Sequence, residues 1–209
     1  WDDVEPVDIM SAGFPCQPFS VAGDREGNND ERAIFQWIAD GISVLRPSVV
    51  VLENVAGILT LGGTSVIGAL TEIGYDAKWG LVRASDVGAC HTRRRWFCIA
   101  HPKGSGLERH KFSPFPVFEQ KQFNAAICNG SDRFAGYESA VRRWEAILGR
   151  TAPVPVDERG INNSFVEWMM GLPENHVCNQ GLSRTAEVKM LGNGVVPQQA
   201  LLALALLNE

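Results

Sequence analysis

The sequence has 209 residues, which is enough for one large domain, or for one domain with a smaller insert, around a sizeable hydrophobic core. Apolar residues make up 45% and charged residues 21%, and no segment repeats at a fixed period, which argues against a disordered chain and against a solenoid. The formal charge of −5 is uneven, because residues 1–60 carry a balance of −7 and residues 83–150 a balance of +6. The basic middle third is either a surface that faces phosphates or an ordinary solvated one.

No apolar run approaches the ~20 residues that a membrane span needs. Five cysteines stand at irregular positions, namely 16, 90, 98, 128 and 178. An odd count without a signal peptide argues against a disulfide framework and for a reducing compartment, so we expect a cytoplasmic protein.

Hydrophobic periodicity predicts an α/β fold for the first hundred residues. The expected elements are, in chain order, strand 7–12, helix 34–45, strand 49–52, helix 66–73, strands 75–82 and 96–100, a helix through 141–148, a short helix over 165–170 and a last helix from 197. The first strand, helix and buried strand predict a parallel crossover. Thr64 or Ser65 is the expected N-cap of the second helix. The last helix is apolar nearly all round, so we expect it to be buried against the sheet.

The first candidate site is Pro15-Cys16-Gln17-Pro18, at the carboxyl end of the first strand, where open α/β sheets bind their ligands. A thiol held between prolines in a glycine-led turn suits a nucleophile. The alternative is a buried structural cysteine.

Two further groups lie at the same edge of the predicted sheet. A carboxyl at Glu53, partly removed from water, retains its proton more readily and could donate it near neutral pH. Arg93 and Arg95 point to the same side of a strand by alternation, and either reach one anionic site or form a solvated strand end. The alternative for Glu53 is a helix or loop cap.

Taken together and in this order, these segments resemble the DNA cytosine-5 methyltransferase family, and in particular its phage-type members. Four motifs carry the resemblance: Gly13-Phe-Pro-Cys-Gln-Pro-Phe-Ser20, Glu53-Asn-Val55, the pair Arg93 and Arg95, and Gly192-Asn-Gly-Val-Val-Pro197. The segment Phe165 to Pro173 is similar to the one that precedes the last motif in phage-type members. The resemblance implies a partial Rossmann-like methyltransferase sheet with helices on both faces, and a small inserted target-recognition region. It divides the chain into a catalytic core over 1–102, a recognition insert over 103–157 and a return to the core over 158–209.

The resemblance implies transfer of a methyl group from S-adenosylmethionine to C5 of a flipped cytosine in double-stranded DNA, in a bacterial or phage-infected cell. Cys16 would add to C6 of the base, Glu53 would protonate N3, and Arg95 with Arg93 would bind the nucleotide or orient Glu53. The remaining implied or expected contacts are Pro15, Asn193 and Val195 for the donor, and Gln17, Ser20, Arg142 and Arg143 for DNA. No metal is expected.

Two departures from the family pattern bear on these expectations. His91 stands where the family has glutamine, and the donor-binding strand and Gly-rich loop of the family have no counterpart after Trp1. We therefore expect the isolated chain to bind the donor weakly and not to methylate DNA unless another polypeptide supplies that segment. The alternative function is a split or truncated methyltransferase part that binds DNA or a partner chain without turnover.

Two other classes of site remain as alternatives. One is a cysteine hydrolase that pairs Cys16 with a histidine, although no nucleophile-on-helix signature supports it. The other is a zinc site built from Cys90, His91, Cys98 and His101, whose spacing lacks the usual paired ligands.

Overall fold

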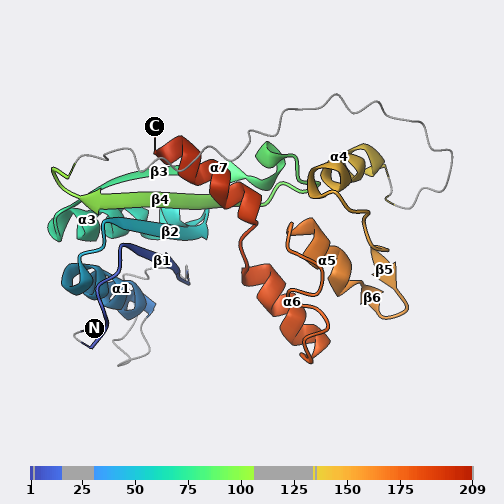
Figure 1. The fold of residues 1–209 in the computed structure, drawn as a ribbon, viewed down its shortest axis with the longest axis horizontal. Helices are drawn as coiled ribbons and strands as arrows, with labels where there is room; N and C mark the ends of the chain where they lie inside the picture. The colour runs from blue at the N-terminus through green and yellow to red at the C-terminus, as the bar shows by residue number, and fades with distance from the viewer. Residues whose placement is uncertain (2, 16–30, 106–133, 135, 209) are drawn as a thin grey trace. The chain divides into compact units, whose positions relative to one another are not determined.

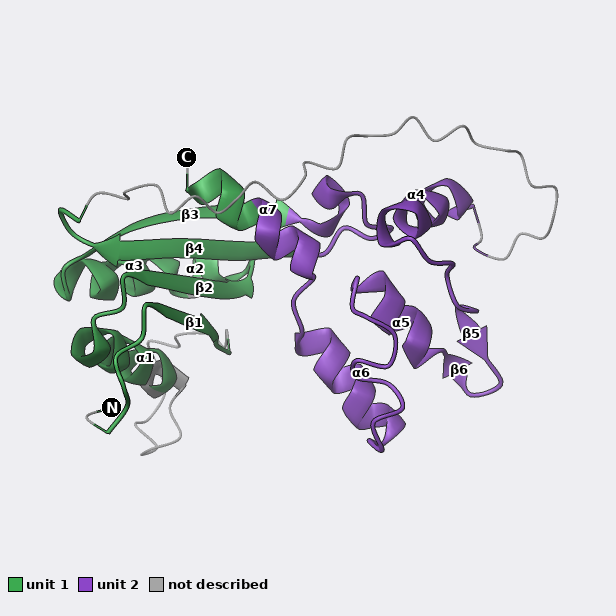
Figure 2. Ribbon diagram, in the orientation of Figure 1, with its two compact units in different colours: residues 1–82, 94–112, 203–209 green, residues 83–93, 113–202 purple. Residues whose placement is uncertain are grey.

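The computed structural model describes the chain except for residues 2, 16–30, 106–133, 135 and 209. The chain forms two compact units, each of which is assembled from separate stretches of sequence (Figure 2). Unit 1 comprises residues 1–82, 94–112 and 203–209, and unit 2 comprises residues 83–93 and 113–202.

Unit 1 is built on a four-stranded sheet with the strand order β1-β2-β4-β3 (Figure 1). Its elements are β1 (Ile9–Gly13), α1 (Glu31–Leu45), β2 (Val49–Val55), α2 (Ile58–Leu61), α3 (Gly63–Glu72), β3 (Tyr75–Arg83) and β4 (Arg94–Pro102). Strand β1 pairs with β2 in parallel, whereas β4 runs antiparallel to β2. The predicted strands, the first helix and the parallel crossover are confirmed.

The core of unit 1 lies between the sheet and helices α1 and α3. Helix α1 buries Phe35, Ala39 and Ile42, whose spacing of three to four residues places them on one face of the helix. Val50 and Leu52 of β2 meet them from the sheet and are fully buried. Each such side chain stabilises the fold by about 1.5–3 kcal/mol. The C-terminal part of helix α7 (Pro197–Leu207) covers the other face of the sheet, as expected for helices on both faces (Figure 1).

The predicted N-cap of the second helix is wrong. Gly62 is the N-cap of α3, with a φ of 148°, and no side chain caps the helix. Thr64 and Ser65 lie in the first turn and are exposed. The short helix α2 ends at the same glycine, whose N–H donates to the carbonyl of Ile58. Two helices meet here at a backbone conformation that residues with a side chain rarely adopt, so a hydroxyl cap has no place to act.

Unit 2 is mostly helical. Its elements are a 3-10 turn (Ala84–Val87), α4 (Glu138–Leu148), β5 (Val156–Asp157), β6 (Gly160–Ile161), α5 (Asn163–Met169), α6 (Arg184–Asn193) and the first part of α7. Val141 and Trp144 of α4 are buried, which confirms the predicted amphipathic helix. Trp144 donates from Nε1 to the backbone carbonyl of Trp168 in α5 at 3.1 Å, so a hydrogen bond also links helices α4 and α5 inside the core of unit 2.

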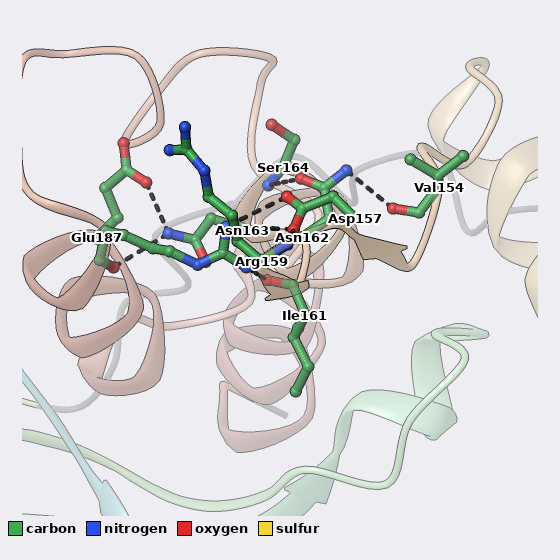
Figure 3. Close-up of polar contacts among 9 residues, drawn as sticks. Val154, Asp157, Arg159, Ile161, Asn162, Asn163, Ser164 and Glu187 are labelled. Carbon is green, nitrogen blue, oxygen red and sulfur yellow. Dashed lines mark hydrogen bonds and ion pairs between the residues drawn. The ribbon is translucent and has the colours of Figure 1, made fainter.

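Polar contacts attach the β5–β6 hairpin to helices α5 and α6 (Figure 3). Asn162 accepts from the N–H of Ser164, which caps α5, and donates to the carbonyl of Val154. Arg184 of α6 pairs with Asp157 at 3.2 Å, and this hydrogen bond is the main cause that lowers the pKa of Asp157. These contacts give an exposed hairpin of four strand residues a fixed attachment.

The stretch Arg184–Leu207 is long enough and apolar enough to cross a membrane by length and composition alone. It is interrupted, because α6 ends at Asn193 and α7 begins at Pro197. Val196, Gln199 and Ala203 are buried against the rest of the protein. The burial of α7 is one-sided, since Leu206 is 53% exposed.

A buried carboxylate organises the loop after α5. Glu167 is 2% exposed and accepts hydrogen bonds from the backbone N–H groups of Asn175, Val177 and Cys178, at 2.9, 2.6 and 3.0 Å. Such charge-assisted bonds are about twice as strong as neutral ones. The charge of Glu167 is therefore balanced by backbone donors rather than by a cation.

We expect Glu167→Gln to lower the free energy of unfolding by about 2–3 kcal/mol, because the amide –NH₂ group opposes backbone N–H donors in a buried site. Glu174→Gln, at an exposed carboxylate of the same loop, is the matched control and should change stability by less than about 0.5 kcal/mol. Urea denaturation measures both values. Equal effects of the two substitutions would contradict the role of Glu167.

Candidate functional site

The ends of β1 and β2 are held together by a buried amide. The parallel register places Gly13, the last residue of β1, beside Glu53. The next residue of β2, Asn54, is 3% exposed and donates from Nδ2 to the carbonyl of Phe14 at 2.9 Å. The Phe14 ring packs on Phe35 of α1, with the centroids 5.1 Å apart. The backbone that leads into Pro15 and Cys16 is thus fixed from both sides.

Glu53 and Arg95 form an ion pair in the same unit. Arg95 Nε lies 3.0 Å from Glu53 Oε1, and the two side chains are 15% and 16% exposed. In the β2–β4 register Glu53 is opposite Phe97, and Arg95 is two residues before Phe97 on the same face. The Glu53 carboxylate also lies close to Gly13, where an added Cβ would stand 3.4 Å from Oε2. The guanidinium therefore orients a carboxylate that lies beside the end of β1.

The predicted nucleophile, Cys16, and the predicted DNA contacts Gln17 and Ser20 lie outside the described residues. Three cysteines are described. Burial raises the pKa of Cys98 to about 12 and that of Cys178 to about 11, and it also raises the pKa of Cys90. None of these three thiols is suited to act as a thiolate at neutral pH. Among the residues that the structure describes, no group of three or more His, Cys, Asp or Glu side chains is arranged to hold a metal ion.

Arg93 contacts the last motif, within unit 2. Its Nη2 donates to the carbonyls of Gly192 and Gly194, at 2.8 and 2.5 Å. These two glycines flank Asn193, the predicted donor contact, whose exposed side chain makes no hydrogen bond to the described part of the chain. Val195, the other predicted contact of this motif, is partly buried. Although Arg93 and Arg95 are two residues apart, they have different partners.

His91 and Arg143 also contact backbone carbonyls in unit 2. His91 Nε2 lies 2.9 Å from the carbonyl of Met169, and Nδ1 faces the N–H of Arg93 at 3.4 Å. Burial is the main cause that lowers the pKa of His91. Of the two predicted DNA contacts on α4, Arg143 is exposed but donates from Nε to the carbonyl of Gly88 at 3.1 Å, while Arg142 is half-buried.

Sequence reasoning missed two tethering residues. Gln199 is fully buried and donates from Nε2 to the carbonyl of Arg93 at 2.8 Å. A glutamine within the apolar run of the last helix was the available signal, since a buried amide needs a hydrogen-bond partner. Asn54 was noted only as part of a triplet, yet it joins the ends of the two strands.

Comparison with known proteins identifies the family. Residues 2–134 match the family model described as C-5 cytosine-specific DNA methylase. The chain belongs to this family. The sequence-based resemblance to this family is confirmed.

Two curated relatives are type II methyltransferases. The chain is 41% identical over 101 residues to M.CviJI of Paramecium bursaria Chlorella virus IL3A, which covers 47% of this chain and 28% of the relative. It is 34% identical over 158 residues to M.NaeI of Lentzea aerocolonigenes, which covers 72% of this chain and 36% of the relative. The chain thus spans about a third of the length of these methylases.

Solved structures confirm the predicted fold class. The S. pombe Dnmt2 methyltransferase superposes with a TM-score of 0.62 at 18% identity, covering 96% of this chain and 78% of that one. A Spodoptera frugiperda DNMT2 variant gives 0.60 at 18% identity, covering 97% and 80%. The mixed sheet with helices on both faces is therefore the methyltransferase fold.

The burial of His91 predicts a pH effect on stability. Because the pKa is lower in the folded protein than in the unfolded chain, the unfolded chain binds the proton more readily. Stability should be complete above about pH 6.5, the ordinary histidine pKa, and fall as the pH drops below it. In His91→Gln this component should vanish, since an amide donates to the Met169 carbonyl without titrating.

Thermal melts between pH 5 and pH 8 measure this effect. The exposed His176 provides the control, because His176→Gln should retain the wild-type pH dependence. A pH profile of His91→Gln that coincides with the wild-type profile would show that His91 does not contribute.

Proposed function

We propose that this protein transfers a methyl group from S-adenosylmethionine to C5 of a cytosine in duplex DNA. The observation that carries the proposal is the arrangement at the end of β2 in a member of the methylase family. There, an arginine-oriented carboxylate lies beside the strand end that leads into Pro15 and Cys16. A carboxyl group held in place by a guanidinium can bind a ring nitrogen and, in its protonated form, supply it with a proton.

In this proposal two side chains act on the base and a third holds one of them in place. The Cys16 thiolate forms a bond to C6, and the Glu53 carboxyl supplies a proton or hydrogen bond to N3, so that electron density rises at C5. Arg95 holds Glu53 in place. Bound S-adenosylmethionine supplies an electrophilic methyl group that C5 attacks. Breaking the S–CH₃ bond of the donor would leave S-adenosylhomocysteine. Transfer of the C5 proton to water, return of the N3 proton to Glu53 and release of the Cys16 thiolate would then restore the aromatic ring.

The exposed Asn193 side chain fits the role of donor contact, because its amide is not used by the described part of the protein and can bind a polar ligand. Pro15 is exposed at the end of β1 and Val195 follows the Gly192–Gly194 segment, so we assign both to the donor as well.

The proposed substrate is duplex DNA, in which a cytosine must leave the base stack before a thiol can reach C6. That step costs a few kcal/mol and is favoured by protein groups that fill the gap and hold the backbone. We assign Gln17 and Ser20 to the gap, and Arg142 and Arg143 to the phosphates. The contact of Asn54 with the carbonyl of Phe14, which fixes the backbone two positions before Cys16 in the sequence, supports the first assignment, and the +6 balance over residues 83–150 supports the second.

A mixed-sequence duplex that carries 5-fluorocytosine at every cytosine tests the reaction. With the donor present, and with a polypeptide that supplies the family's donor-binding strand and Gly-rich loop, the protein should form a covalent adduct, because fluorine at C5 cannot leave as a proton does and the Cys16 bond persists. Cys16→Ala should form none. Glu53→Gln should form the adduct about 10²–10⁴-fold more slowly, since it loses the proton donor.

Cys178→Ala is the matched control and should react like the wild type, because that thiol is buried. Denaturing gels and peptide mass spectrometry identify the adduct. Failure of the wild type to form one, or an undiminished adduct in Cys16→Ala, would overturn the proposed chemistry.

The phosphate assignment predicts a change in salt dependence. The double substitution Arg142→Gln and Arg143→Gln should reduce the slope of log affinity against log salt by about 2, as each phosphate contact contributes close to one. Arg159→Gln, at an exposed arginine of the β5–β6 hairpin, is the control and should leave the slope unchanged. Fluorescence anisotropy with duplex DNA gives the slopes. Unchanged slopes in the double variant would mean that α4 does not face DNA.

A further inference from the structure

Arg93 lies at the centre of a small network that joins three parts of unit 2. Its carbonyl accepts hydrogen bonds from the N–H of Ala84, at 2.9 Å, and from Gln199 of α7, at 2.8 Å. Its guanidinium group reaches the end of α6 through Gly192 and Gly194. The backbone of Arg93 is therefore fixed by two hydrogen bonds. Its side chain holds the end of α6, which lies about 100 positions further along the chain.

The geometry at α6 is that of a helix C-terminus stabilised by an external cation. The last carbonyls of a helix have no partner within the helix, and the helix dipole favours positive charge there. One –NH₂ group of Arg93 provides two N–H bonds, and its two acceptors are the carbonyls on either side of Asn193. A cation that joins residues 192 and 194 restricts the backbone of residue 193 between them.

The glycines on either side make this restriction necessary. Gly192 has open space at the position of a Cβ, and Gly194 is the C-cap, with its N–H donating to the carbonyl of Leu191 at 3.3 Å. Glycine loses more conformational freedom on ordering than any other residue. Without a fixed partner, this turn would sample several conformations.

We propose that Arg93 is a positioning residue for donor binding, which presents Asn193 by bridging the carbonyls of Gly192 and Gly194. The inference rests on the proposed function, because it takes the methyl donor as the ligand of Asn193. It assigns to Arg93 a role different from that of Arg95, which is paired with Glu53. The two arginines of the motif thus serve different substrates: Arg93 acts on the donor side, and Arg95 acts on the side of the base.

The test compares Arg93→Met and Arg93→Lys with the wild-type protein. Arg93→Met should raise the dissociation constant and the KM of S-adenosylmethionine at least 10-fold, while kcat at saturating donor and the KM of DNA stay within about 3-fold. In Arg93→Lys, where an ammonium with three donors replaces the guanidinium and keeps the positive charge, the donor affinity should recover in part. Hydrogen exchange of the peptide that spans residues 190–197 should be at least 10-fold faster in Arg93→Met.

Arg150→Met is the matched control, since Arg150 also donates to a backbone carbonyl of unit 2, that of Leu172. This variant should leave donor affinity and exchange at residues 190–197 unchanged. Unchanged exchange in Arg93→Met, or a loss confined to the KM of DNA, would overturn the inference. A wild-type protein that binds no donor would contradict the proposed function instead, and the exchange measurement would still decide whether Arg93 holds the turn.

Discussion

Strand β2 pairs with one parallel and one antiparallel neighbour, and the position of the candidate site depends on this pairing. Its parallel partner, β1, ends at the same edge, and its antiparallel partner, β4, begins there. Alternation along β2 then sends Glu53 toward Arg95, while the next residue, Asn54, turns to the buried carbonyl of Phe14. A shift of one residue in this register would exchange the two side chains and remove both contacts.

Elements with a strong hydrophobic periodicity could be predicted from the sequence alone. Helix α1 and strand β2 were predictable because apolar residues mark a single face in the first and a continuous run in the second. Helix α6 has no such face, because its apolar and polar residues are mixed around the helix, and it is held by contacts such as that between Asn163 and Glu187. The cap of α3 was missed for a similar reason, because Gly62 acts through its φ angle and not through a side chain.

The site was predictable in its residue types but not in its pairings. The triplet that contains Glu53 and the two arginines were recognisable, yet alternation alone placed Arg93 and Arg95 on one side with a common target. The structure instead gives Arg93 two carbonyls about 100 residues away, a partner that no local pattern can reveal. In unit 2, charged side chains repeatedly bind backbone groups of another segment. Arg93, Arg150 and Glu167 each satisfy backbone groups of another segment, so local loops are fixed by single side chains.

The direction of β4 separates two parts of the chain that can vary independently. Arg95 stands at the beginning of the strand, and the turn at Lys103 and Ser105 follows its far end. Seven residues of extended chain correspond to about 24 Å. Insertions or deletions after residue 105 therefore enter the chain far from the Glu53–Arg95 ion pair. The length of that region can change without altering the alignment of Glu53 with Arg95. An insertion between Gly88 and Arg94 has no such freedom, because it would change the spacing between His91, Arg93 and the strand itself.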